Sequence, residues 1–190
     1  MYERNYFGMS MVEQGDADAF ITGLYTKYSN TIKVAKDVIG IRDEYKTFGT
    51  MHILNTQKGV YYIADTLINR HPDEDVLTDI AKLSAGTVKF FNEEPVMAML
   101  SYSNFGTDAI GSPVKVKKAV AEMQKVYPDL AIDGEMQVNY ALNKQLRDEK
   151  YPFSRLKGKD VNTLVFPNLS SANGAYKLLQ ALNPEAEIIG

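Results

Sequence analysis

The chain has 190 residues, of which 45% are hydrophobic and 24% are charged, and its formal net charge is −3. This composition is typical of a globular protein with one ordinary domain or two small ones, and it argues against a disordered or membrane-embedded chain. The negative net charge argues against broad nucleic-acid binding, because that function needs lysine and arginine to neutralise phosphates.

The features that report on cellular compartment point to the cytoplasm. The sequence contains no cysteine, which excludes disulfides, thiolate metal sites and cysteine nucleophiles. Its longest apolar runs, such as 96–100 and 164–166, are far shorter than a membrane-spanning helix. No basic segment followed by an apolar stretch opens the chain, so secretion is not expected. We therefore expect a cytoplasmic protein with no membrane partner.

The N-terminal part of the chain predicts two helices with a short strand between them. Apolar spacing predicts a helix over 2–13, and the run 19–23 predicts a short strand that a glycine ends. Ser29 or Asn30 can cap a second helix over 31–39.

A hairpin and a long helix follow. Residues 48–54 and 60–64 predict two strands joined by a turn at 57–59. Pro72 opens the helix, and the three carboxylates after it suit the positive end of the helix dipole. Apolar residues at three- and four-residue steps continue this helix to about residue 91.

From residue 73 onward helices and strands alternate. After the long helix, the predicted elements are a strand over 96–102, a helix over 113–127, a strand over 130–133, a helix over 136–150, a strand over 162–166 and a helix over 171–182. This alternation predicts a three-layer α/β/α fold with a mostly parallel sheet, which the hairpin makes mixed. No linker or repeat interrupts the chain, so we expect a single α/β domain over 1–190.

Three loops leave strands at the carboxyl edge of this predicted sheet, at 101–112, 133–137 and 167–173. Ligands of open α/β sheets bind at this edge, and the helix N-termini that follow can hold phosphate or carboxylate groups. The alternative is that their small polar residues only cap helices. Three such loops at one edge favour a ligand site.

The charged and metal-ligating residues add little to this picture. Lys115, Lys117 and Lys118 follow the first loop and form either a solvated helix face or a rim that attracts phosphate. His52 and His71 have no other ligand at metal spacing, so no metal site is expected. Glycine-rich nucleotide motifs are missing from the sequence.

Six blocks of the sequence resemble the phosphate acetyltransferase (phosphotransacetylase) family, in the family's order. They are RNYFGMSMVEQGDADAFITG, VYYIADTLINRHPDEDVLTDIA, EPVMAMLSYSNFG, DGEMQVNYALN, YPFSRLKG and VFPNLSSANGAYKL. The resemblance implies the reaction acetyl-CoA + phosphate ⇌ acetyl phosphate + CoA, without an active-site metal. It implies that the chain is the second lobe of a two-lobed module, with an isocitrate/isopropylmalate dehydrogenase-like fold. It also implies self-association as a homodimer through this lobe.

The resemblance assigns no catalytic residue to this chain. The family's catalytic Ser-Arg-Gly motif is expected after Gly190, and the pair Ser154-Arg155 belongs to another block. In the free-standing enzymes the loop after the strand resembles Ser-Phe-Ser-Thr-Lys-Gly-Ser, so Phe105 stands at a lysine position. Asn139 likewise replaces a family aspartate. These departures predict binding without acetyl transfer, because a phenyl ring cannot neutralise developing charge.

The residues of these blocks are most similar to those of the C-terminal domain of large bacterial NADP-dependent malic enzymes. This similarity implies a regulatory and oligomerisation module that responds to acetyl-CoA. NADP and a divalent metal would then bind only in upstream domains, and this chain would hold no cofactor of its own. Two alternatives stay open: an active phosphate acetyltransferase and a structural dimerisation lobe without a ligand. The residues expected to line an acetyl-CoA or phosphate site are Ser101, Ser103, Asn104, Phe105, Gly106, Asp133, Glu135, Gln137, Asn168, Ser170 and Asn173.

Overall fold

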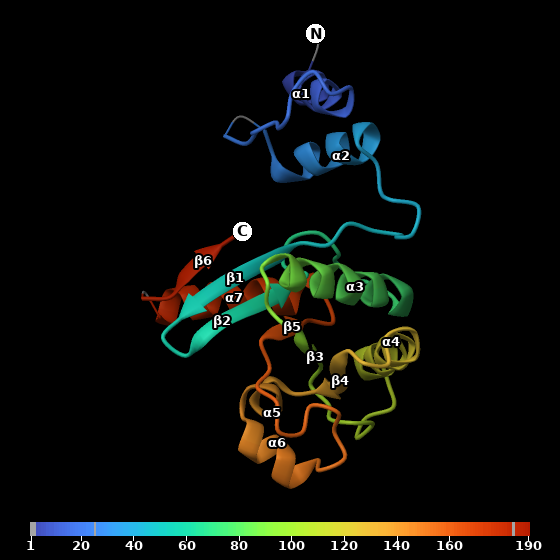
Figure 1. Ribbon diagram of the computed structural model, residues 1–190, viewed down its shortest axis with the longest axis vertical. Coiled ribbons are helices and arrows are strands. Elements are labelled where there is room, and N and C mark those ends of the chain that lie inside the picture. The colour runs from blue at the N-terminus through green and yellow to red at the C-terminus, as the bar shows by residue number, and fades with distance from the viewer. Residues whose placement is uncertain (1–2, 25, 184) are drawn as a thin grey trace. The chain divides into compact units, whose positions relative to one another are not determined.

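The computed structural model describes residues 3–24, 26–183 and 185–190, and the chain divides into two compact units (Figure 1). Residues 1–46 form a helical unit, and residues 47–190 form a sheet unit. The predicted α/β architecture belongs to the sheet unit, and the expectation of one domain over 1–190 stays a prediction. No helix among the described residues has the length and apolar character needed to cross a membrane.

The sheet unit is built on six strands in the order β4-β3-β5-β2-β1-β6. Their bounds are Met51–Thr56 (β1), Gly59–Ala64 (β2), Val96–Leu100 (β3), Ala131–Met136 (β4), Thr163–Val165 (β5) and Glu187–Ile189 (β6). The four strands β4, β3, β5 and β2 are parallel, and β1 is antiparallel to both of its neighbours. The mostly parallel, mixed sheet predicted from the sequence is therefore confirmed.

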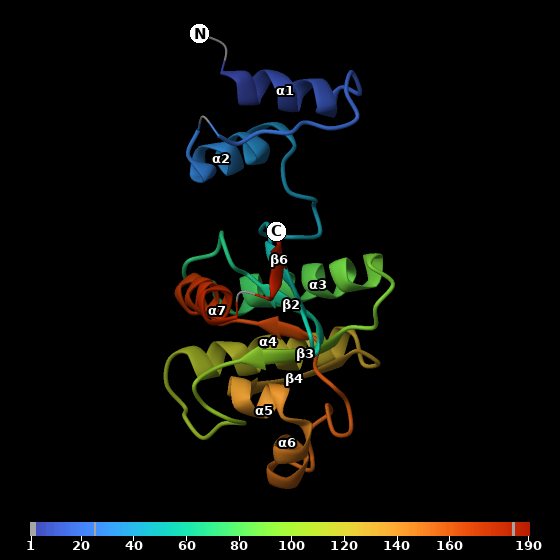
Figure 2. The same ribbon diagram turned by 90° about the vertical axis from the view of Figure 1, so that its left-hand side faces the viewer.

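Helices cover both faces of this sheet, which confirms the three layers. The helices of the sheet unit are Glu74–Phe90 (α3), Ser112–Val126 (α4), Val138–Leu142 (α5), Lys144–Lys150 (α6) and Leu169–Leu182 (α7). Met97 and Met99 of β3 pack in one core cluster with α3 and α4, whereas Ala98 and Leu100 pack with α5 on the opposite face. Tyr176 of α7 packs on that same opposite face against β1 and β2. Figure 2 shows α3 and α7 on opposite sides of the strands.

The C-terminal half of the sheet unit differs from the sequence prediction at three points. Strand β4 continues through Met136, so the segment predicted as a loop over 133–137 is mostly strand. The single helix predicted over 136–150 is two helices, because Asn143 is extended and its side chain accepts a hydrogen bond from Leu146 N as an N-cap. The three-residue strand β6 was not predicted, since so short a segment carries no periodic signal.

Within its described residues, the helical unit contains two helices, Arg4–Glu13 (α1) and Tyr28–Val38 (α2). The second helix begins at Tyr28, before the predicted caps Ser29 and Asn30, and makes no side-chain capping bond.

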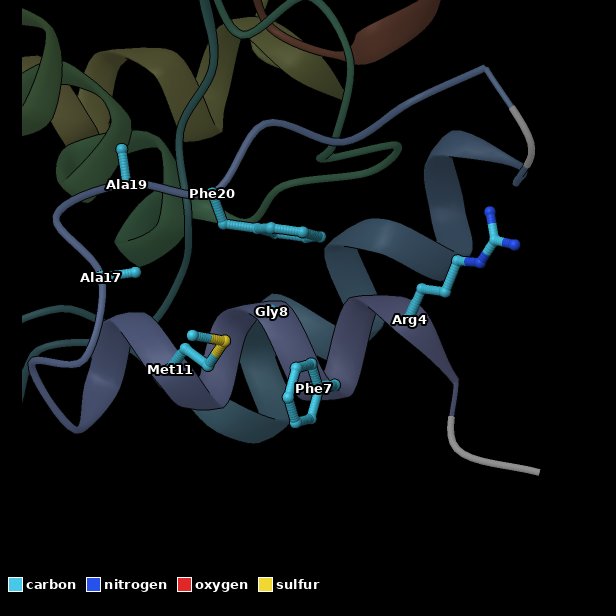
Figure 3. Close-up of a pocket in the computed structure, with 7 residues that line it drawn as sticks. All are labelled: Arg4, Phe7, Gly8, Met11, Ala17, Ala19 and Phe20. Atoms are coloured by element: carbon cyan, nitrogen blue, oxygen red, sulfur yellow. The ribbon is translucent and has the colours of Figure 1, made fainter.

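The strand predicted over 19–23 is wrong, because among the described residues this segment pairs with no strand, and its side chains hold it against α1. Phe20 lies directly over Gly8, where any Cβ would overlap its ring (Figure 3). Thr22 donates a hydrogen bond to Asn5, 2.7 Å between their side-chain oxygens. Between α1 and 17–20 lies a mostly apolar cavity of about 470 Å³, with Arg4 at one end (Figure 3).

Candidate functional site

The site expected from the topology lies where β3 and β5 adjoin. The chain leaves β3 through α4 on one face of the sheet, and it leaves β5 through α7 on the other face. Ligands of open α/β sheets bind at the carboxyl ends of two such neighbouring strands. The loop 101–111 and residues 166–168 follow these two strands, so the fold brings two of the three predicted loops to this point.

Glu135 fastens the loop 101–111 to the end of β4. Its side chain is 0% exposed, and its Oε1 accepts hydrogen bonds from Gly106 N at 2.5 Å and from Ser103 Oγ at 3.3 Å. The main-chain oxygen of Glu135 accepts a third bond, from Phe105 N at 2.8 Å. Glu135 therefore acts on the backbone of the loop. Within the described residues, its Oε2 and the buried Oγ of Ser101 have no hydrogen-bond partner.

The other polar residues predicted in this loop are also engaged in holding it. Ser103 Oγ accepts a hydrogen bond from Asp108 N at 3.0 Å. Asn104 Oδ1 accepts one from Gln137 N at 2.8 Å, and Gln137 Nε2 donates to the carbonyl of Tyr102 at 2.7 Å. The loop is thus fixed to the start of α5 before any ligand arrives.

Phe105 and Gly106 form the turn of this loop. Both have positive φ, +48° for Phe105 and +86° for Gly106, a region that glycine adopts easily and phenylalanine rarely. The Phe105 ring packs against Tyr151 and Phe153, with ring centroids 4.8 and 5.1 Å away. Burial, and then the neighbouring Tyr140, raise the pKa of Tyr151. The ring contacts with Tyr151 and Phe153 thus leave Phe105 half-buried in an aromatic cluster.

Asp133 lies within β4 and orders the segment that follows α6. Its Oδ2 accepts hydrogen bonds from Ser154 Oγ and Arg155 N, both at 2.8 Å. This contact also explains Ser154, which is buried against Asp133 in a supporting role. Neither residue belongs to the loops at the carboxyl edge.

The third predicted group divides between capping and contact with another loop. Asn168 Oδ1 accepts a hydrogen bond from Ser171 N at 2.9 Å and so caps α7. Asn173 Nδ2 donates to the carbonyl of Thr66 at 3.2 Å, in the loop after β2. Ser170 is exposed.

Sequence reasoning missed the buried polar cluster in this loop after β2. Asp65 is 3% exposed, and its Oδ2 accepts hydrogen bonds from Asn69 N and Nδ2, each at 2.6 Å. Its Oδ1 accepts from Thr50, through both the amide and the hydroxyl. The sequence carries a signal for this cluster, because Asp65 directly follows a strand that is parallel to β3 and β5. Its position therefore matches the preference of ligands for the carboxyl ends of parallel strands. The three predicted loops all follow strands after residue 73, so they leave out this one.

His52 lies next to this cluster and is buried neutral. Its Nδ1 is 2.7 Å from Thr66 Oγ1, and its ring stacks on Tyr176 with the centroids 4.2 Å apart. Burial, and then the charge of Lys177, lower the pKa of His52. These contacts make His52 part of the packing between β1 and α7.

The three lysines near the start of α4 have different surroundings. Lys115 Nζ donates to the carbonyl of Pro72 at 2.6 Å, and Lys118 pairs with Glu74 at 2.8 Å. Lys117 makes no hydrogen bond or ion pair within the described residues, and its Nζ is 3.6 Å from where a Cβ of Gly106 would lie. Of the three, Lys117 alone is directed to the loop 101–111.

The fold and this carboxyl edge define an α/β domain of the doubly wound type. Within that class, the chain belongs to the phosphate acetyl/butaryl transferase family, whose model matches residues 1–190. The family resemblance noted from the sequence blocks is thereby confirmed.

Two kinds of relatives share this chain's sequence. It is 39% identical over 183 residues to an NADP-dependent malic enzyme of Escherichia coli, covering 96% of this chain and 24% of that protein. It is 35% identical over 182 residues to a phosphate acetyltransferase of Bacillus subtilis, covering 96% of this chain and 56% of that protein. The chain thus spans about a quarter of the malic enzyme and just over half of the transferase.

A solved structure supports the same relationship. A phosphotransacetylase from Streptococcus pyogenes superposes with a TM-score of 0.89 at 33% identity, covering 98% of this chain and 56% of that one. The α/β fold of the sheet unit is therefore that of the phosphotransacetylases.

Proposed function

We propose that this chain is the phosphate acetyltransferase-like domain of an NADP-dependent malic enzyme. In this role it binds acetyl-CoA, or phosphate, without transferring an acetyl group. Ligand binding regulates the enzyme, and contacts between two copies of the domain join the enzyme into a homodimer. The parent reaction converts malate to pyruvate and CO2, with NADP and the divalent metal bound in upstream domains. The identity to the Escherichia coli malic enzyme supports this placement.

The observation that carries the proposal is the environment of Phe105. The resemblance to the free-standing transferases places a lysine at this position, where a cation would stabilise the charge that develops as the acetyl group moves. Here the side chain is a phenyl ring held between Tyr151 and Phe153. The loop therefore lacks that cation at the position where the transfer chemistry would use it.

The same loop keeps the features of a binding site. Glu135, Ser103 and Asn104 hold its backbone in one conformation, so a ligand would not have to order it on binding. If acetyl-CoA binds one state of the enzyme better than another, the coupling to malate oxidation would be about 1–3 kcal/mol. That difference corresponds to roughly 5- to 150-fold in affinity.

The test measures two activities of the full-length protein. We expect malate oxidation to change when acetyl-CoA is added, and no acetyl phosphate to form from acetyl-CoA and phosphate. Rapid formation of acetyl phosphate would overturn the proposal in favour of an active phosphate acetyltransferase, which the Bacillus subtilis relative supports. In that case Ser101 and Ser103 would help to position the substrate.

A matched variant separates the two functions. Phe105→Lys restores the family residue, and Phe105→Leu serves as a control that removes the ring without adding charge. If the loop is a transferase loop that lacks only its cation, Phe105→Lys alone gains acetyl phosphate formation. If it gains none, the loop serves binding only.

A further inference from the structure

Four aromatic side chains meet beside the loop 101–111. Phe105 comes from the loop itself, Tyr140 from α5, and Tyr151 and Phe153 from the segment after α6. Neighbouring ring centroids lie 4.8 to 6.0 Å apart. Phe153 is 68% exposed although it contacts two of the other rings. The cluster therefore presents a firmly supported aromatic face to solvent.

A cation approaches the same loop one residue after Phe105. Gly106 directly follows Phe105, and the Nζ of Lys117 stands 3.6 Å from the Cβ position of Gly106. Near the start of α4, Lys115 and Lys118 are occupied by contacts with Pro72 and Glu74, so Lys117 is the lysine of these three left available to an outside group.

The carboxylates of this neighbourhood do not neutralise Lys117. Glu135 lies beneath the loop, fully buried, and the Gly106 amide donates to it. Asp108 accepts hydrogen bonds from Ile110 N and from the hydroxyl of Tyr102, both at 3.0 Å. Neither carboxylate forms an ion pair with Lys117 among the described residues.

We propose that Phe153 and Lys117 form a nucleotide subsite at the loop 101–111, in which a purine ring stacks on the exposed ring of Phe153, supported by Phe105, and a phosphate contacts the lysine. Stacking suits an exposed aromatic face, because every base presents a π surface. A lysine binds phosphate as a point charge. This inference rests on the proposed function, since the adenine and phosphates of acetyl-CoA supply both groups in one molecule.

The test is titration calorimetry of the full-length protein with four probes: acetyl-CoA, adenosine 3′,5′-bisphosphate, ADP and pantetheine. Phe153→Ala should weaken the binding of acetyl-CoA and of adenosine 3′,5′-bisphosphate by about tenfold and leave pantetheine unchanged. Phe90→Ala is the matched control, because Phe90 is 80% exposed on α3, outside the cluster.

Lysine variants test the phosphate contact. Lys117→Gln should weaken adenosine 3′,5′-bisphosphate by about threefold or more and make its binding less sensitive to salt. Lys118→Gln, which removes only an exposed pair with Glu74, should have no such effect. Unchanged circular dichroism establishes that each variant is folded.

The outcomes separate this subsite from the proposed function. If acetyl-CoA binds and regulates malate oxidation but both variants leave its affinity unchanged, the subsite is wrong and the proposed function stands. If adenosine 3′,5′-bisphosphate or ADP binds through Phe153 while acetyl-CoA has no effect on malate oxidation, the subsite stands and the proposed function fails. If Phe153→Ala changes only the sedimentation coefficient, the aromatic face is a contact between copies of the chain, which would overturn the inference.

Discussion

The carboxylate of Glu135 reaches from β4 to the loop after β3, where it accepts hydrogen bonds from Gly106 N and Ser103 Oγ. Glu135→Ala would remove the acceptor for both donors. We expect it to lower the free energy of unfolding by about 1–3 kcal/mol, the usual cost of leaving buried polar groups unpaired. Glu135→Gln keeps an acceptor oxygen, so urea denaturation should show a smaller decrease in the free energy of unfolding for this variant. Equal losses for the two variants would contradict this role.

At the same scale, His52 should give the stability of the sheet unit a defined pH dependence. Burial first, and then Lys177, lower the pKa of His52 in the folded protein, so the unfolded chain, with a histidine pKa of about 6.5, binds the proton more readily. The stability contributed by neutral His52 is therefore full above about pH 6.5 and is lost as the pH falls through the folded pKa.

The measurement for His52 compares the protein with His52→Asn in urea denaturation between about pH 7.5 and about pH 5. The stability advantage of the unaltered protein over the variant should shrink as the pH falls, because only the unaltered protein must keep a buried histidine unprotonated. An advantage that stays constant or grows toward acid pH would show that His52 is not buried neutral.

Among the elements, α7 begins at Leu169, two residues before its predicted start, because Asn168 caps it through Ser171 N. Asn168→Ala should lower the free energy of unfolding by about 1 kcal/mol, measured by thermal or urea denaturation. Asn168→Asp keeps the capping oxygen and adds a charge that favours the positive end of the helix dipole, so it should lose little or nothing. If both variants weakened acetyl-CoA binding without affecting stability, Asn168 would be a ligand contact, as the sequence had suggested.

The elements also show where sequence patterns stop being sufficient. The long helix after Pro72 was predicted within two residues of α3 from its apolar spacing and the carboxylates at its start, although Asp73 is the N-cap and lies outside the first turn. The break at Asn143 was missed, since helical spacing runs across it and only the local capping bond to Leu146 N distinguishes two helices from one. Strand β4 was shortened in the prediction because Gly134 looks like a turn residue.

Gly134 is in fact required inside the sheet, where its φ is +147° and a Cβ would overlap the carbonyl oxygen of Met99 on β3. The sequence could show the glycine but not the neighbouring strand that needs it. The same limit applies to the candidate site. The loops were predicted from strand order along the chain, whereas the bonds of Ser103 with Glu135 and of Asn104 with Gln137 depend on β3 and β4 being adjacent.

At the scale of the whole molecule, alternation of helices and strands was enough to predict a parallel sheet in three layers. It could not give the position of β5 between β3 and β2, because the length of a connection does not fix which edge the next strand joins. That position decides which loops flank the candidate site and brings the Asp65 cluster to the same edge.

The division into two units leads to a prediction for the whole chain. All residues of the three core clusters lie between Met51 and Ile188, so the buried apolar side chains of these clusters belong to the sheet unit. A chain of residues 47–190 should therefore unfold cooperatively in urea and keep near-ultraviolet circular dichroism from its packed aromatic residues. The matched control, residues 74–190, lacks the hairpin of β1 and β2 and exposes the edge of β5. It should aggregate or unfold without a sharp transition. If the 47–190 chain behaved like this control, the sheet would depend on the helical unit, and residues 1–190 would be one domain as the sequence first indicated.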